Sequence, residues 1–164
     1  MQRLFTPLLT PLGQALILII LSGIIGLGSN SLRSDSIPLL AEKLTETTTL
    51  EPTSSEPVLV AVNLDQAKQL YDEGVIFVDA RPDEYFVQGH VAGAWKSGFL
   101  LELAFNLEEK QGKQAPIVIY CSDDGCGDSE EVAYDLQSQG FTRIYVFKGG
   151  WQEWNQAGYP TAVE

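Results

Sequence analysis

Hydrophobic and polar positions divide the chain into three stretches with different patterns. The first stretch is almost wholly apolar: residues 15–27 read ALILIILSGIIGL, and no charged side chain lies between Arg3 and Arg33. A helix over residues 11–27 would be about 26 Å long, close to the thickness of the hydrocarbon core of a bilayer. We therefore predict that residues 1–28 form a transmembrane helix or a cleaved signal peptide; a buried helix of a soluble protein is the third interpretation.

The second stretch, residues 29–56, is polar. It contains the segment LTETTTLEPTSSEP, which is rich in Thr, Ser, Glu and Pro and has little apolar periodicity. Such a composition predicts a flexible linker. A transmembrane helix and a signal peptide would both export the rest of the chain, and the slight excess of positive charge at the N-terminus favours a cytoplasmic N-terminus. We expect residues 57–164 on the periplasmic side of a bacterial inner membrane, anchored there, or free in the periplasm if the N-terminus is cleaved.

The third stretch, residues 57–164, alternates between short apolar runs and amphipathic segments. PVLVAV, VIFVDA, PIVIY and IYVF are runs of the kind that forms strands buried on both faces of a parallel sheet. Asn63 with Gln66, and Asp128 with Glu131, have the spacing of helix capping boxes. This alternation predicts an α/β layer fold with a parallel central sheet. Further helices are expected at residues 82–88, 98–106 and 149–158.

Composition narrows the kinds of partner. The chain has 164 residues, of which 10 are Lys or Arg and 22 are Asp or Glu, so its formal net charge is −12. Nucleic acids and anionic lipid surfaces require a basic face, so neither is expected as the main partner. Two cysteines and one histidine are too few for a disulfide-dense scaffold or a His-rich metal cage. We expect no metal and no cofactor.

The candidate chemistry lies at one predicted joint between a strand and a helix. Cys121 directly follows PIVIY, so it should lie at the carboxyl edge of the sheet, where open parallel sheets bind ligands. The loop after it leads into a predicted helix, whose first N–H groups favour an anion such as a thiolate or a persulfide. Asp79 ends another predicted strand and should emerge at the same edge. Cys121 is therefore the candidate nucleophile.

Three motifs in sequence order resemble the rhodanese family. VIFVDARPDEYFVQGHVAGAW resembles the family pattern of D-x-R, E-Y and G-H-[IV]-x-G-A, PIVIYC resembles its active-site cysteine, and VFKGGWQEWNQAGYP resembles its closing G-G-x-x-x-W-x-x-A-G-Y-P. The resemblance covers residues 57–164 and implies a rhodanese-like, doubly wound α/β fold. It also implies a sulfurtransferase in which Cys121 carries sulfane sulfur, as a persulfide, to a thiol acceptor. The framework positions implied to support the site are Asp79, Arg81, Glu84 and His90.

The loop after Cys121 departs from the family pattern. It is longer than the loop of many active members, and Cys126 stands where an arginine is often found. No Lys or Arg lies between Lys113 and Arg143, so the acidic side chains should repel a thiosulfate dianion, which is not expected as the preferred donor. The loop carboxylates should disfavour the thiolate form of Cys121 and the loop amides should favour it, and the sequence leaves both outcomes open. The loop consists of Ser122, Asp123, Asp124, Gly125, Cys126, Gly127 and Asp128.

The second cysteine, Cys126, is compatible with several functions. Cys121 and Cys126 are close enough in sequence to reach disulfide distance across a curved loop. Cys126 could resolve a persulfide on Cys121, cycle with it as an exported thiol–disulfide redox module, staple the loop, or stay an unpaired thiol. A non-catalytic rhodanese-like protein-binding module that presents the acidic loop is the remaining alternative. The expected partners are a small sulfur donor, a thiol or persulfide acceptor protein, and the membrane through the N-terminal helix.

Overall fold

The computed structural model describes residues 11–33 and 58–164, and the chain divides into a unit Met1–Lys43 and a unit Leu44–Glu164. In the first unit, helix α1 (Pro11–Ser31) continues beyond the predicted end at Leu27. Its Leu and Ile side chains are exposed, and its segment Leu12–Ser31 is long and apolar enough to cross a membrane, a test that a signal sequence also passes. Most of the predicted linker lies outside the described residues.

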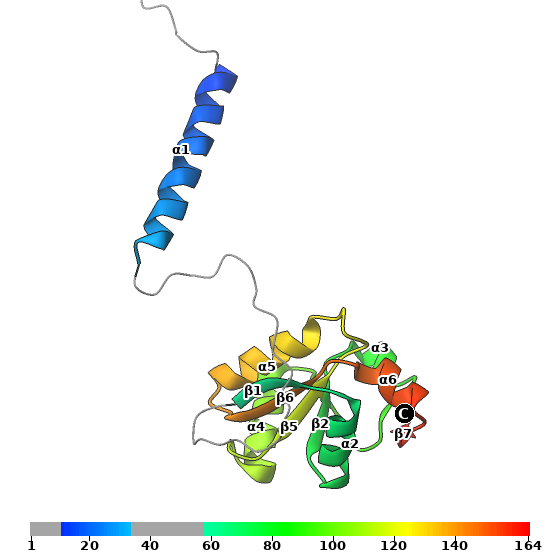
Figure 1. Ribbon diagram of the computed structural model, residues 1–164. Helices are drawn as coiled ribbons and strands as arrows, with labels where there is room; N and C mark the ends of the chain where they lie inside the picture. Colours follow the sequence, from blue (N-terminus) through cyan, green and yellow to red (C-terminus); the bar gives the residue numbers. More distant parts are fainter. Residues whose placement is uncertain (1–10, 34–57) are drawn as a thin grey trace, which may run out of the picture. The chain divides into compact units, whose positions relative to one another are not determined.

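The second unit is built around a five-stranded sheet in which every strand pair is parallel (Figure 1). The four apolar runs are strands, and the predicted parallel sheet is confirmed. Trp95, the last residue of the segment HVAGAW, and Lys96 form an edge strand of this sheet, and a separate two-stranded antiparallel sheet pairs β3 (His90–Val91) with β7 (Thr161–Ala162). In spatial order the main sheet contains β1 (Val58–Val62), β6 (Arg143–Phe147), β5 (Ile117–Tyr120), β2 (Ile76–Asp79) and β4 (Trp95–Lys96).

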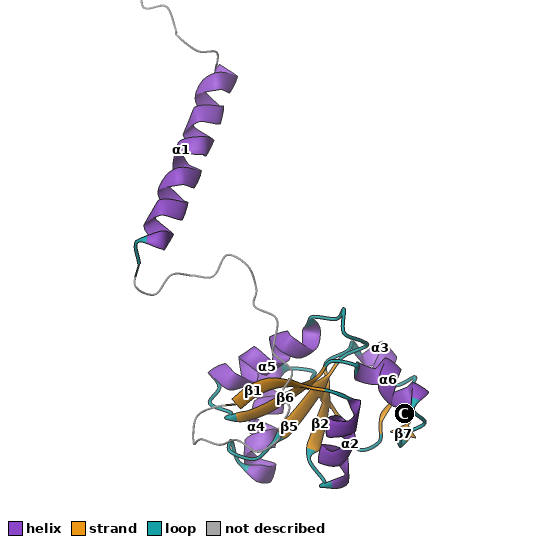
Figure 2. Cartoon of the chain, in the orientation of Figure 1, coloured by secondary structure: helices purple, strands orange, loops and turns teal. Residues whose placement is uncertain are grey.

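Helices cover both faces of this sheet, as a doubly wound fold requires (Figure 2). The side chains of β5 alternate between two cores: Ile117 and Ile119 lie in one, and Val118 and Tyr120 lie in the other. The first core includes residues of α4 and α5, and the second includes residues of α2 and α6. Because both faces of the strand are buried in this way, its sequence is a continuous apolar run. The helices are α2 (Leu64–Asp72), α3 (Asp83–Phe86), α4 (Leu100–Gln111), α5 (Asp128–Ser138) and α6 (Gly150–Gln156).

The two predicted capping boxes have different outcomes. At α2, Asn63 Oδ1 accepts from the Gln66 N–H at 3.0 Å, and Gln66 Oε1 accepts from the Asn63 N–H at 3.0 Å, so the first is confirmed. At α5 the prediction is wrong, because Gly127 is the N-cap residue and makes no side-chain cap bond. Asp128 is the first residue of the helix, and its carboxylate faces Cys121 instead. The Asp128 side chain is therefore available to the candidate site and does not cap the helix.

Candidate active site

The backbone of Cys121 is held firmly at the carboxyl end of β5. The Trp151 N–H at the start of α6 donates to the Cys121 carbonyl at 2.8 Å, and the Gln152 N–H donates to the Ser122 carbonyl at 2.9 Å. Gly150 allows this close approach: its φ is +56°, and a Cβ there would lie 2.5 Å from the Cys121 carbonyl oxygen. Cys121 itself is only 2% exposed. The end of β5 and the start of α6 therefore fix the backbone of Cys121 at the point where the loop begins.

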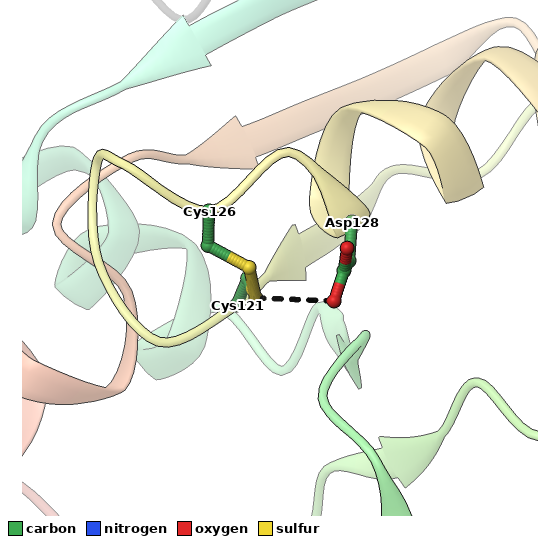
Figure 3. Close-up of side chains that lie close together, drawn as sticks. All are labelled: Cys121, Cys126 and Asp128. Carbon is green, nitrogen blue, oxygen red and sulfur yellow. Dashed lines mark hydrogen bonds between the residues drawn. A yellow bond between two sulfur atoms is a disulfide. The ribbon is translucent and has the colours of Figure 1, made fainter.

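A tight turn folds the loop back over this cysteine. The Gly125 N–H donates to Asp123 Oδ1 at 2.8 Å, and the Cys126 N–H donates to the Asp123 carbonyl at 3.2 Å. The turn brings Cys126 to Cys121, and their Sγ atoms form a disulfide with the Cα atoms 6.0 Å apart (Figure 3). In this state both cysteines of the chain are oxidised. A free thiol at Cys121 exists only after this bond is reduced.

Asp128 points at the sulfur of Cys121 from the first turn of α5 (Figure 3). Its Oδ2 lies 3.9 Å from Cys121 Sγ. A disulfide sulfur carries no hydrogen, so this contact is a hydrogen bond only when Cys121 is a thiol. One ligand atom from each of Cys121, Cys126 and Asp128 lies within 4.8 Å of the others. Thiolates bind metals and a disulfide does not, so the three cannot act as a metal site in the oxidised state.

The acidic loop has a cation that the sequence did not predict. Lys148 Nζ lies 2.5 Å from Glu130 Oε1 and 3.6 Å from Asp124 Oδ1. Lys148 directly follows β6, the neighbour of β5. Like Asp79 at the end of β2, it therefore lies at the carboxyl edge of the parallel sheet. Its charge is already paired with two carboxylates. Asp123 and Asp128 are exposed, and within the described part of the chain neither forms an ion pair.

Asp79 and Arg81 form a buried pair beside the site. Arg81 Nη2 donates to Asp79 Oδ2 at 2.6 Å, and Arg81 Nε donates to Asp79 Oδ1 at 2.9 Å. Arg81 also donates to the Gly89 carbonyl at 2.7 Å, and the Tyr120 hydroxyl donates to Asp79 Oδ2 at 2.7 Å. Burial would lower the pKa of Arg81, but hydrogen bonding and the charge of Asp79 outweigh it and raise that pKa. Burial, aided by the charge of Asp79, raises the pKa of Tyr120. The network ties β2 to the residue that precedes Cys121.

The other two framework candidates are anchored elsewhere. His90 is buried, with Nδ1 2.9 Å from the Phe86 carbonyl and its ring stacked on Phe86 at a centroid distance of 3.7 Å. Glu84 is exposed in the first turn of α3, where its carbonyl accepts from the Gln88 side chain at 2.7 Å. These contacts hold α3 and β3 together. The structure thus gathers Cys121, Cys126 and Asp128, with their loop, and gives His90 and Glu84 contacts outside that group.

Comparison with known proteins gives a family match and a relative of similar sequence. Residues 63–157 match the family model described as the rhodanese-like domain. The chain is 30% identical over 88 residues to the thiosulfate sulfurtransferase GlpE of Coxiella burnetii, covering 54% of this chain and 78% of the relative.

Two solved structures have the same fold. The rhodanese-like domain of the Alr3790 protein of Anabaena superposes with a TM-score of 0.52 at 23% identity, over 62% of this chain and 77% of that one. A thiosulfate sulfurtransferase from Pseudomonas aeruginosa superposes with a TM-score of 0.53 at 14% identity, over 63% of this chain and 20% of that one. At these identities the structural similarity concerns the fold.

Proposed function

This chain belongs to the rhodanese-like domain family, and on that premise we propose that it is a sulfurtransferase that carries sulfane sulfur on Cys121 and passes it to a thiol acceptor. The observation that supports this proposal is the position of Cys121. It directly follows β5 at the carboxyl edge of a parallel sheet, where its backbone is fixed and a loop leads into the first turn of α5. A nucleophile at such a joint is held in place while its reaction partners approach from the loop side.

The proposed reaction needs the reduced state of the chain. An external dithiol first opens the disulfide and becomes oxidised itself. The Cys121 thiolate then attacks the outer sulfur of an organic persulfide, forming a persulfide on Cys121 and releasing the donor as a thiolate. In the second half-reaction, an acceptor thiolate attacks the outer sulfur of that persulfide, takes it over, and regenerates the Cys121 thiolate. Each step exchanges one sulfur–sulfur bond for another.

Charge at the loop argues for a weakly charged donor. Four carboxylates, those of Asp123, Asp124, Asp128 and Glu130, lie on the loop and the first turn of α5. Only Asp124 and Glu130 pair with Lys148, so the formal charge of this group is −3 (four minus one). At about 6 Å each uncompensated carboxylate would repel each charge of a thiosulfate dianion by about 1 kcal/mol. We therefore propose that an organic persulfide is a better donor than thiosulfate.

Mass spectrometry tests this proposal. The reduced 164-residue chain, carrying Cys126→Ser so that Cys121 is its single thiol, is offered cysteine persulfide or thiosulfate, and its intact mass and Cys121 peptide are measured after quenching. We expect the mass of one sulfur atom on Cys121, faster from the persulfide, and none on a Cys121→Ser chain. Ser138→Ala, at the exposed end of α5, is the matched control when added to Cys126→Ser and should load like Cys126→Ser alone. No added sulfur from either donor would contradict the proposal, and faster loading from thiosulfate would contradict the donor preference.

The Cys121–Cys126 disulfide favours a second candidate, a thiol–disulfide redox module. In that case an external dithiol and the chain exchange oxidation state, and no sulfane sulfur is carried. The same experiment separates the two functions, because a redox module would gain no sulfur on Cys121 even in the Cys126→Ser chain. If neither reaction occurred, the non-catalytic binding module would be the remaining function.

The apolar helix α1 supports a proposal on location. As a membrane anchor or a signal sequence it would carry the domain to the periplasmic side of a bacterial inner membrane. A disulfide such as Cys121–Cys126 persists in such an oxidising compartment. Fractionation of cells, followed by protease treatment of intact spheroplasts, tests this: the domain should be degraded from outside, and its protection would contradict export.

A further inference from the structure

We infer that Cys126 is a resolving thiol that attacks the Cys121 persulfide and releases its outer sulfur as sulfide. The inference rests on the proposed function, because it requires sulfane sulfur on Cys121, and it adds an activity to it. The chain would then be a sulfane-sulfur reductase whose electrons come from an external dithiol. A carrier that only passes sulfur to an acceptor does not need the second cysteine.

The geometry of the loop supports a direct attack. Cys126 Sγ is bonded to Cys121 Sγ, so the second sulfur reaches the inner sulfur of a persulfide at that position. The Cα atoms are 6.0 Å apart, within the range that a disulfide accepts without backbone movement. The two hydrogen bonds from α6 fix Cys121 and Ser122, and the turn at Asp123 aims Cys126 back at them. The loop is thus built to bring the two sulfurs together.

Proximity gives Cys126 an advantage over an acceptor thiol from solution. In the disulfide form Cys121 is 2% exposed, and the folded loop covers it. Cys126 is part of that cover and is itself partly exposed. A nucleophile held next to its target reacts as if it were present at a very high concentration. Resolution within the chain should therefore be faster than transfer of the sulfur to a dilute acceptor.

The resolving step balances without a further oxidant. The Cys126 thiolate attacks the inner sulfur of the Cys121 persulfide, the bond between the two cysteine sulfurs forms, and the bond to the outer sulfur breaks. The outer sulfur leaves as hydrosulfide with the electron pair of that bond, so it is reduced while the two cysteines are oxidised to the disulfide. Asp123 and Asp128 are exposed at the loop and repel this departing anion. An external dithiol then reduces the disulfide and completes the cycle.

A single-turnover experiment tests the inference. The full chain is reduced, freed of reductant and mixed with an equimolar amount of cysteine persulfide, and free sulfide and intact mass are measured over time. The wild type and the Ser138→Ala control should release sulfide in an amount equal to the disulfide formed. Cys126→Ser should instead keep the added sulfur on Cys121 and release sulfide at least ~100-fold more slowly until a thiol is added.

The outcomes distinguish the inference from the proposed function. If the wild type keeps the added sulfur as long as Cys126→Ser does, and forms no disulfide, the inference is wrong and the sulfurtransferase proposal stands. If neither the wild type nor Cys126→Ser ever gains sulfur or releases sulfide, both are wrong. Cys126→Ala is a second variant in case the serine form does not fold, and tryptophan fluorescence checks the fold of each chain before the reaction.

Discussion

Reduction of the Cys121–Cys126 disulfide should lower the free energy of unfolding by a small and calculable amount. The bond joins residues with a sequence separation of 5. For so short a loop, the chain-entropy relation gives about 2 kcal/mol at 25 °C, less than for disulfides that close long loops. By linkage, folding should favour the disulfide over the dithiol by the same free energy, about 30-fold in the equilibrium constant.

Urea denaturation of the full chain in detergent micelles measures this effect. The signal is tryptophan fluorescence, because all three tryptophans lie in the α/β domain and none lies in α1. Unfolding curves are compared with and without a dithiol reductant. The wild type should lose about 2 kcal/mol on reduction, at an unchanged dependence on urea.

Cys126→Ser is the control for this prediction. It lacks the disulfide, so reductant should leave its stability unchanged, and it should match the reduced wild type to within about 0.5 kcal/mol. A wild type whose stability does not respond to reductant would refute the loop-closure reasoning. An equal loss in Cys126→Ser would refute it too, because the effect would then come from another part of the chain.

Three further changes test the framework around the site. Asp79→Asn leaves the buried Arg81 guanidinium without its counter-charge, so urea denaturation should show a loss of about 3–5 kcal/mol, and a loss under about 1 kcal/mol would contradict the importance of the pair. Gly150→Ala should slow persulfide loading at least ~10-fold, because its Cβ would lie 2.5 Å from the backbone that carries the candidate nucleophile. Gly74→Ala is its matched control, with a similar positive φ of +80° and nothing within 4 Å, and equal loading by both variants would refute the role of the contact. Burial, aided by Asp79, raises the pKa of Tyr120 above its ordinary 10.0, so at higher pH the unfolded chain loses a proton that the folded chain keeps. Above about pH 10 the stability of the wild type should therefore fall about 1.4 kcal/mol per pH unit more steeply than that of Tyr120→Phe, and parallel slopes would contradict this.

The main sheet was predictable because its central strands carry a strong signal. Each is a continuous apolar run, since both of its faces pack against helices, as the side chains of β5 do. The short strands β3, β4 and β7 have only two residues each. Two residues show no periodicity, and their strand character comes from the partner they pair with. No local pattern could have predicted them.

The site was predictable in its position and less so in its electrostatics. Cys121 could be placed because the end of a buried strand is visible in the sequence. The sequence did not show that Asp128 faces this sulfur, because Asp128 also fits the N-cap position of a capping box. In the structure Gly127 is the N-cap residue of α5, and Asp128 contacts Cys121. The sequence of the loop does not reveal Lys148, because this cation lies at the end of the neighbouring strand β6. Contacts across a sheet edge depend on strand order, which periodicity does not give.

The sulfur content of one peptide decides whether Cys121 carries sulfane sulfur. The reduced Cys126→Ser chain is exposed to cysteine persulfide, digested, and the mass of the peptide that contains Cys121 is measured before and after addition of a thiol. We predict that this peptide gains one sulfur atom and that the thiol removes it. An unchanged mass in a chain that is folded and reduced would mean that Cys121 carries no sulfane sulfur, and sulfur transfer would have to be abandoned as the function.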